Sequence, residues 1–310
     1  MRGRISQGLR IVYYYLTFAC NLDCKHCYVG DHLSFTKHAD YDLVISNLKD
    51  SFSHGARKLV FLGGEPSLHP RFFDFLDKSA ELGYENITVD TNGASQYPVP
   101  LRSWAQEKLT IRIGFEGIDA TTHDYIRGKN TFNQALDTLH RVMDQGIKTE
   151  VTVTINALNF SALKKIVQFF DRESVDEINF HFVSMMGNCK KYPELRLSAE
   201  QILSAQVQLT ALNATHDLPI RFPRLLQKRE ISSLNGWNFS DQCRLFNQDV
   251  LLLFPEGQMC RCPLQIDSNF SCPPMDNMPS SHGQCPFAQY LITGDIPEGY
   301  EMTCISWKEI

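Results

Sequence analysis

Strand-like and helix-like segments alternate between residue 11 and about residue 215. The predicted strands are Ile11–Thr17, Lys58–Leu62, Ile87–Asp90, Thr110–Phe115, Thr149–Ile155 and Glu177–Val183. Amphipathic segments separate them, and strands that alternate with helices form a parallel sheet with right-handed crossovers. We therefore predict an α/β fold, a partial (β/α)6 barrel over residues 1–215, with its chemistry at the carboxyl ends of the strands.

Two of the helical segments carry capping signals at their starts. Thr131 with Gln134, and Ser198 with Gln201, have the spacing of a capping box. Gly146 is the predicted stop of the first of these helices.

The composition narrows the classes of function. The net charge is −5, whereas a nucleic-acid-binding protein needs a positively charged surface. The sequence has no apolar run of membrane-spanning length. We expect a cytoplasmic protein without nucleic-acid or membrane partners. In that compartment the ten cysteines point to metal binding or catalysis, with structural disulfides as the alternative.

The pattern changes past residue 240. Asp249–Phe254 is strand-like, a Pro-Glu-Gly turn follows, and the next segment has no helical periodicity. The cysteines of this region are Cys243, Cys260, Cys262, Cys272, Cys285 and Cys304. We predict a small domain over residues 216–310 that is organised by metal binding.

A second group of cysteines lies directly after the first predicted strand. Cys20, Cys24 and Cys27 share one loop, where closely spaced thiolates can converge on an iron–sulfur cluster. Three thiolates leave one iron of a cubane open to another ligand. A zinc knuckle with His26 as the fourth ligand is the alternative, although His26 lies between two of the proposed ligands.

This C-x-x-x-C-x-x-C spacing resembles the signature of the radical S-adenosylmethionine (SAM) superfamily, with His26 at its aromatic position. The resemblance implies a partial (β/α)6 radical SAM barrel that binds a [4Fe-4S] cluster and SAM. It also implies that a reducing partner such as flavodoxin or ferredoxin supplies an electron. Cleavage of SAM would then produce a 5′-deoxyadenosyl radical that abstracts a substrate hydrogen.

Two further motifs end the second and third predicted strands. Gly63, Gly64, Glu65 and Pro66 resemble the motif that holds the amino group of SAM. Paired glycines permit close approach to a ligand and a carboxylate accepts from an ammonium group, although the motif has a purely structural reading as a turn. Asn92 lies where relatives contact the SAM ribose and the substrate, and an Asn-Gly turn is the alternative.

The region after the fourth predicted strand resembles a "SLDG…HD…RG" stretch of peptide-modifying relatives but departs from it twice. Gly114 replaces a serine that often contacts SAM, and Glu116 replaces an aspartate. Arg127 either pairs with the SAM carboxylate or forms a structural salt bridge. Asn156 and Val183 match positions near the ribose and adenine of SAM.

The C-terminal cysteines resemble the start of a SPASM or shorter "twitch" auxiliary-cluster domain. We expect one auxiliary [4Fe-4S] cluster with Cys243, Cys262, Cys285 and Cys304 as ligands, and a zinc site with the same ligands is the alternative. The later C-x-x-C element of such domains is missing.

Two spare cysteines, Cys189 and Cys260, are predicted hydrogen donors to a substrate radical. Buried cysteines without a chemical role are the alternative. The resemblance favours modification of a peptide by epimerisation, oxidation or crosslinking. The alternatives are epimerisation or dehydrogenation of a small polyol or aminoglycoside-type metabolite, and an iron–sulfur electron-transfer protein.

Overall fold

The computed structural model describes residues 8–94, 102–228, 249–260, 262, 266 and 296–302. Its main sheet has the order β10-β9-β1-β2-β3-β4-β5-β6-β7. The strands are β1 Ile11–Thr17, β2 Lys58–Gly63, β3 Asn86–Thr91, β4 Leu109–Phe115, β5 Lys148–Ile155, β6 Glu177–Phe182, β7 Ile220–Arg221, β9 Val250–Leu253 and β10 Met259–Cys260. A separate antiparallel pair consists of β8 Leu226–Lys228 and β11 Tyr300–Met302.

The helices follow the strands in the expected alternation. They are α1 Tyr41–Ser53, α2 Phe72–Leu82, α3 Ala105–Lys108, α4 Ala120–Arg127, α5 Thr131–Met143, α6 Leu163–Arg172 and α7 Ala199–Asn213. Short 3-10 helices are η1 Gly30–His32, η2 Pro66–Leu68, η3 Phe160–Ala162, η4 Gly187–Lys191 and η5 Pro193–Leu195. None of the helices in the described ranges is long and apolar enough to cross a membrane.

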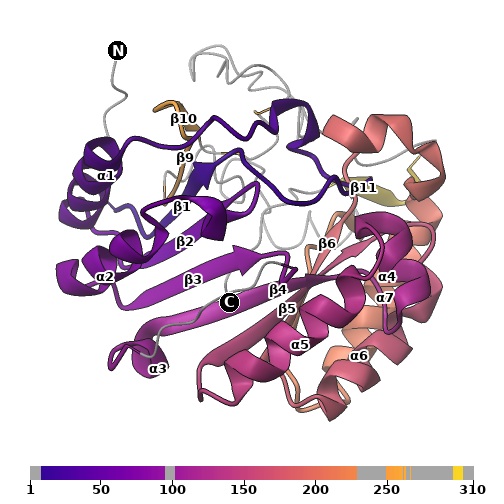
Figure 1. Ribbon diagram of the computed structural model, residues 1–310. Coiled ribbons are helices and arrows are strands. Elements are labelled where there is room, and N and C mark those ends of the chain that lie inside the picture. Colours follow the sequence, from indigo (N-terminus) through magenta and orange to yellow (C-terminus); the bar gives the residue numbers. More distant parts are fainter. Residues whose placement is uncertain are drawn as a thin grey trace.

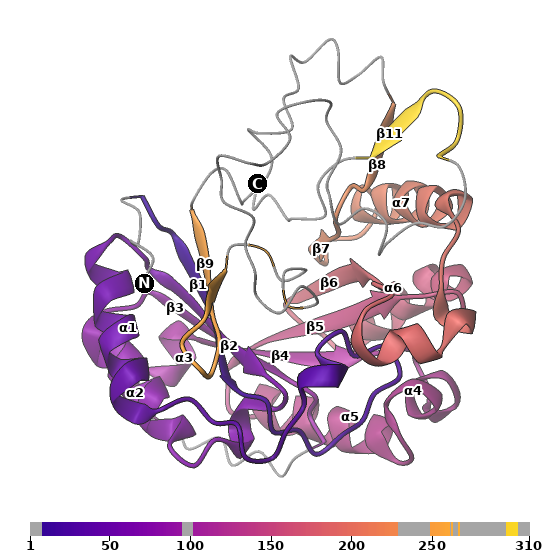
Figure 2. The same ribbon diagram turned by 90° about the horizontal axis from the view of Figure 1, so that it is seen from above.

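The predicted partial barrel is confirmed. Strands β1 to β6 are neighbours in chain order and all parallel, and among the described residues the sheet ends at β10 and β7 without closing. Figures 1 and 2 show the curved sheet with α1, α2, α5 and α6 along its outer side. The outward-facing strand residues form one buried apolar core with these helices.

Strands from the C-terminal third extend this sheet at both edges. The four residues of β9 are all buried and pair in parallel with Ile11–Tyr14 of β1, while β7 pairs with β6. A short, fully apolar run gains more by burial at a sheet edge than by exposure to water. Residues on both sides of the predicted boundary at 215 therefore share one sheet, and the separate C-terminal domain stays a prediction.

The two predicted capping boxes have different outcomes. The box at Ser198 is confirmed, because its side chain accepts from the Gln201 backbone and the Gln201 side chain accepts from the Ser198 backbone. The box at Thr131 is wrong. Instead, the Asp124 carboxylate on α4 accepts hydrogen bonds from the backbone N–H groups of Asn130 and Phe132, at 2.6 and 2.9 Å.

We expect Asp124→Ala to lower the free energy of unfolding by about 1–2 kcal/mol, because the first turn of α5 loses its acceptor. Gln134→Ala is the matched control and should change it by less than about 0.5 kcal/mol, since Gln134 is exposed and does not cap. Urea unfolding of the two variants measures both values. A larger loss in the Gln134 variant would contradict the assignment of the cap to Asp124.

Candidate active site

The three N-terminal cysteines lie together in the loop that follows β1. Cys20, Cys24 and Cys27 are partly buried and unpaired, and the Cys27 N–H donates to the Cys24 carbonyl at 3.1 Å. Burial raises the pKa of Cys24 to about 12 and that of Cys27 to about 11, and it also raises the pKa of Cys20. Thiolate ligation of iron there must displace protons.

This donor set fits an iron–sulfur cluster better than a single metal ion. In the described part of the chain, no three His, Cys, Asp or Glu side chains converge closely enough to hold one ion. The His26 ring, the fourth zinc ligand of the alternative interpretation, instead lies 3.4 Å from a Glu116 oxygen. A cubane accepts thiolates that lie further apart than the ligands of one ion, and thiolates are its usual ligands.

The glycine motif after β2 holds the start of the cysteine loop. Gly64 and Glu65 donate backbone hydrogen bonds to the carbonyls of Thr17 and Ala19, at 2.8 and 2.7 Å. A Cβ at Gly63 or Gly64 would lie 2.2 Å from one of those same carbonyl oxygens. The close approach that these glycines permit is therefore between two chain segments, and ligand binding by Gly63, Gly64 and Pro66 stays a prediction.

Glu65 joins the ends of β2 and β3. Its buried carboxylate accepts from the Ser67 hydroxyl at 2.7 Å, from the Thr91 hydroxyl at 3.0 Å and from the Asn92 N–H at 2.9 Å. Burial raises the pKa of Glu65, and these hydrogen bonds oppose the shift. The carboxylate has a clear structural task, and its predicted contact with the SAM amino group is additional to it.

Asn92 connects the end of β3 to the cysteine loop. Its side-chain amide donates to Asn21 Oδ1 at 2.8 Å and lies 3.9 Å from Cys20 Sγ. Hydrogen bonds to the sulfurs tune iron–sulfur clusters. The structure thus places this predicted site residue beside one of the three cysteines.

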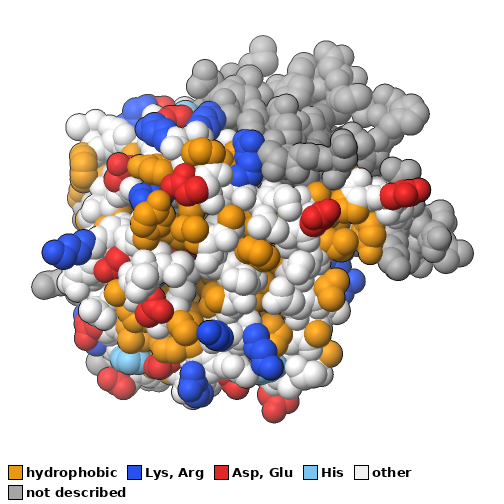
Figure 3. Space-filling view, turned by 90° about the vertical axis from the view of Figure 1, so that its right-hand side faces the viewer, with side chains coloured by type: hydrophobic (Ala, Val, Ile, Leu, Met, Phe, Trp, Pro, Cys, Tyr) orange, Lys and Arg blue, Asp and Glu red, His pale blue; other side chains and the backbone are white. Residues whose placement is uncertain are grey.

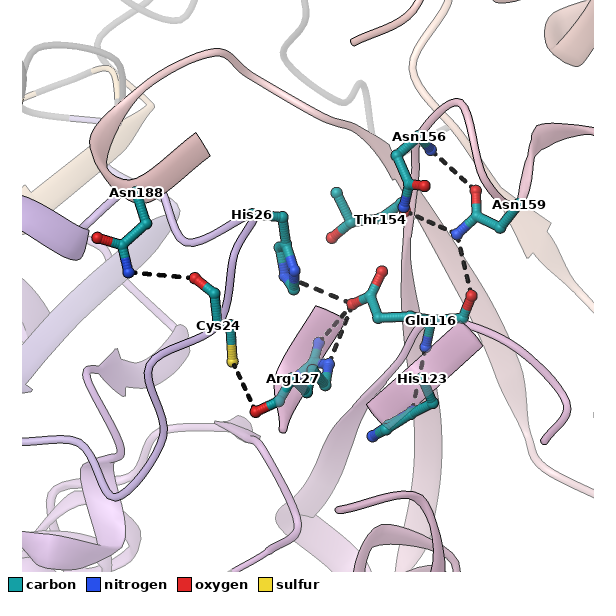
Figure 4. A network of polar contacts seen from close by, with 9 residues as sticks. All are labelled: Cys24, His26, Glu116, His123, Arg127, Thr154, Asn156, Asn159 and Asn188. Carbon is teal, nitrogen blue, oxygen red and sulfur yellow. Dashed lines mark hydrogen bonds and ion pairs between the residues drawn. The ribbon is translucent and has the colours of Figure 1, made fainter. Parts of the chain in front are cut away.

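Figure 4 shows a buried network around Glu116, at the end of β4. Glu116 Oε1 accepts from Arg127 Nε and Nη2 at 3.0 and 2.8 Å, and His26 Nε2 lies 3.4 Å from the same oxygen. The Glu116 N–H donates to His123 Nδ1 at 3.3 Å. The structure therefore contains the salt bridge of Arg127, and its pairing with the SAM carboxylate stays a prediction.

Burial shifts the titration of this network. It raises the pKa of Glu116 to about 7, against the opposing charge of Arg127. It lowers the pKa of His26, and it lowers that of His123 to about 3, so both imidazoles are neutral at pH 7. Within the described residues, three buried atoms of the network have no hydrogen-bond partner: Glu116 Oε2, His26 Nδ1 and His123 Nε2.

The last two cofactor-contact predictions concern the ends of β5 and β6. Asn156 is buried in a local turn, where its N–H donates to Asn159 Oδ1 at 2.8 Å. The Asn159 amide donates in turn to the Glu116 carbonyl at 3.0 Å, which joins the turn to the network in Figure 4. Val183 is buried and donates its N–H to Ile155 O. Contact of Asn156 and Val183 with SAM stays a prediction.

Sequence reasoning missed Asn188, which lies in η4 after β6. Its side-chain amide donates to the Cys24 carbonyl at 3.2 Å, as Figure 4 shows. The same amide donates to Asp23, and the Asn188 N–H donates to the Cys27 carbonyl at 2.9 Å. Gly187 allows this contact, since it has a φ of +51° and a Cβ there would lie 2.5 Å from Cys27 O. An asparagine after a glycine reads only as a turn, so no local signal indicated this role.

The predicted hydrogen donors and auxiliary ligands are only partly described. Cys189 is fully buried with its sulfur 3.6 Å from Met185 Sδ, and burial raises its pKa to about 12. Cys260 is buried in β10, within an apolar cluster against which Cys27 and Cys262 also pack. The other predicted ligands, Cys243, Cys285 and Cys304, lie outside the described residues.

The inner face of the sheet is polar over β3 to β6, whereas over β1, β2 and β9 it forms a second apolar cluster that includes Tyr15, Val60 and Leu252. Arg112 on β4 bridges two neighbouring strands, with Nη1 3.1 Å from Asp90 Oδ1 and Nη2 2.8 Å from Glu150 Oε2. His181 lies on β6, and burial together with the Arg112 charge lowers its pKa to about 3. This face therefore presents charged and neutral polar side chains to the interior of the open barrel.

The outer surface carries mixed charge. On the face shown in Figure 3, Lys and Arg side chains are interspersed with Asp, Glu and hydrophobic side chains. The expectation that nucleic acid is not a partner agrees with this face and stays a prediction.

Three known proteins resemble this chain in sequence or structure. Fe-coproporphyrin III synthase of Methanosarcina barkeri is 26% identical over 62% of this chain, and mycofactocin maturase MftC of Mycobacterium tuberculosis is 25% identical over 82%. The chain spans only 48% and 64% of their respective lengths. SuiB of Streptococcus suis, crystallised with its precursor peptide SuiA, shares the fold with a TM-score of 0.69 at 14% identity, over 88% of this chain and 64% of SuiB.

The sequence pattern of the Radical SAM superfamily matches residues 14–171, which is more than half of the 310 residues. The matched range begins in β1 and ends in α6, so it contains the cysteine loop, the glycine motif and the Glu116–Arg127 network. This chain belongs to the radical SAM superfamily.

Proposed function

We propose that this chain is a radical SAM enzyme that modifies a peptide. The observation that carries the proposal is the loop with Cys20, Cys24 and Cys27, which is held at the carboxyl edge of a parallel sheet. Segments that follow β2, β3, β4 and β6 all contact this loop. The chain belongs to a superfamily of enzymes, and four segments of the barrel contact the cysteine loop. Both observations favour a catalytic role over that of an iron–sulfur carrier.

The three thiolates would hold a [4Fe-4S] cluster, and a one-electron donor such as flavodoxin or ferredoxin would reduce it. When bound, the cluster and SAM supply a 5′-deoxyadenosyl radical that abstracts a substrate hydrogen. The protein's task is to orient and enclose the reactants. Glu65 offers negative charge after β2, and Arg127 at the end of α4 offers positive charge beside Glu116. Asn92 lies between Glu65 and Cys20.

A peptide is the proposed substrate class. SuiB, with which this chain shares its fold, was crystallised with a precursor peptide, and MftC is named a maturase. The polar inner face with Asp90, Arg112 and His181 suits the hydrogen-bonding groups of a peptide backbone or side chain. A small polyol or aminoglycoside-type metabolite is the alternative substrate. Activity assays with peptides encoded by neighbouring genes and with aminoglycoside-type metabolites distinguish the two substrate classes.

An auxiliary cluster is proposed for the C-terminal region, with Cys243, Cys262, Cys285 and Cys304 as ligands. Support comes from the SPASM-like pattern of these cysteines and from the position of Cys262, which packs against the same apolar cluster as Cys27. Zinc bound by the same ligands is the alternative. Iron and zinc analysis of anaerobically reconstituted protein distinguishes these two cases.

We expect reconstituted wild-type protein to carry about eight irons per chain, from two cubanes. Replacement of Cys20, Cys24 and Cys27 together by Ala should remove about half of this iron and abolish SAM cleavage. Iron analysis and detection of 5′-deoxyadenosine by chromatography measure these effects.

Cys272→Ala is the control for the triple variant, since no ligand role is assigned to Cys272. It should keep both the iron content and the SAM cleavage of wild type. Formation of 5′-deoxyadenosine by the triple variant would refute the assignment of the active-site loop.

We expect Glu65→Gln to raise the Kd of SAM at least about tenfold with little change in iron content. The amide oxygen still accepts from Thr91 and Asn92, so the turn persists, but the negative charge that attracts an ammonium group is lost. Ser67→Ala is the control, because it removes a hydrogen bond to Glu65 and keeps the charge. Equal losses of iron and of SAM binding in Glu65→Gln would make the motif a structural turn only.

If the reaction is an epimerisation, a thiol must return a hydrogen to the substrate radical. We expect Cys260→Ala or Cys189→Ala to keep the iron content and SAM cleavage of wild type but to form little epimer. In deuterated water the wild-type product should gain one deuterium, because a thiol exchanges its hydrogen with solvent. A product that lacks solvent deuterium and is two electrons more oxidised than the substrate would exclude epimerisation.

A further inference from the structure

The two departures from the family pattern, Gly114 and Glu116, meet at one side chain. A Cβ built on Gly114 would lie 2.3 Å from Arg127 Nη2 and 2.7 Å from Arg127 Cζ. The Arg127 guanidinium therefore occupies the space that a serine side chain would need. Gly114 pairs with Thr152 of β5, and its neighbours Ile113 and Phe115 belong to the outer core. Position 114 thus faces the interior of the barrel.

Glu116 holds the guanidinium in this position. Both Arg127 donors, Nε and Nη2, bind the same oxygen, Glu116 Oε1. The Arg127 side chain is 10% exposed and that of Glu116 is fully buried, so little solvent screens the pair. An aspartate would end about 1.5 Å short of this oxygen, one carbon–carbon bond nearer to the backbone.

The same pair is attached to the cysteine loop. The Lys25 N–H donates to Ile126 O at 2.9 Å, and Cys24 Sγ lies 4.0 Å from Arg127 O. His26 adds the contact to Glu116 Oε1. Arg127 Nη1 makes no hydrogen bond among the described residues, so its two N–H groups are available to an anionic ligand beside the proposed cluster.

We propose that Gly114 and Glu116 are coupled positioning residues for Arg127. The missing side chain at 114 admits the guanidinium to the inner face of β4, and Glu116 fixes it there. Arg127 Nη1 then donates to the SAM carboxylate from the space beside Gly114. The two departures are then one rearrangement around the Arg127 guanidinium. This inference rests on the proposed SAM-dependent function and assigns its anion subsite.

The test is a double-mutant cycle on SAM binding, measured by equilibrium dialysis with the reconstituted protein. Gly114→Ala places a methyl group against the flexible end of Arg127, so the fold should persist while the guanidinium moves. We expect the Kd of SAM to rise at least about tenfold, with iron content and apo-protein melting temperature close to wild type. In an Arg127→Ala background, Gly114→Ala should change the Kd less than about twofold, because the group that it displaces is gone.

Two further comparisons separate positioning from a general structural effect. Gly117→Ala is the matched control, since a Cβ at position 117 would meet only Thr122, at 3.1 Å. The Kd of SAM for this variant should stay within about twofold of wild type. Glu116→Ala should weaken SAM binding at least about tenfold, whereas Glu116→Gln keeps an acceptor for Arg127 and should restore most of the affinity.

The inference is overturned if Gly114→Ala binds SAM as tightly as wild type, or if its defect is the same size in the Arg127→Ala background. It is also overturned if Glu116→Ala keeps wild-type affinity. Failure of the proposed function is distinguishable, because it would appear as wild-type protein that binds SAM and forms no 5′-deoxyadenosine. The binding cycle does not depend on turnover.

Discussion

The parallel alignment of β1 to β6 determines where the candidate site residues of the barrel lie. In a parallel sheet all carboxyl ends meet at one edge, so segments far apart in sequence become neighbours there. The cysteine loop leaves β1 at this edge and is contacted by Glu65 after β2, Asn92 after β3, Glu116 after β4 and Asn188 after β6. Without this alignment, three cysteines in a loop would have no fixed surroundings in which to bind a cluster and a second ligand.

Most of the barrel was predictable because its signals are local. The bounds predicted for β1 are those of the structure, since Ile11–Thr17 is a short run of β-branched and aromatic residues. The pairing of β9 with β1 was not predictable, because register between strands more than two hundred residues apart leaves no trace in either strand. The cap of α5 was missed for a related reason, since Asp124 belongs to the preceding helix.

In the candidate site, too, local sequence patterns indicated residues, whereas contacts between distant segments were not predictable. Cys20, Cys24 and Cys27 could be proposed as cluster ligands because ligand spacing within one loop is a local pattern. Asn188 was not found, since its contact with the Cys24 carbonyl spans 164 residues and asparagine is common in turns. Gly114 and Glu116 were recognised as departures from a pattern. Their connection depends on the position of the Arg127 side chain, which lies against Gly114 and pairs with Glu116. Sequence spacing does not specify that position.

The polar part of the inner face, over β3 to β6, is hard to explain by stability alone. Arg112 bridges Asp90 and Glu150, and Glu116 pairs with Arg127, with little exposure of either Arg. Removing such charges from water offsets much of their attraction, and well-packed apolar side chains of similar volume stabilise a fold equally well or better. The outer face of the same strands is packed in that apolar way. The charged groups therefore lie on the part of the inner face where the proposed function would place a polar reactant.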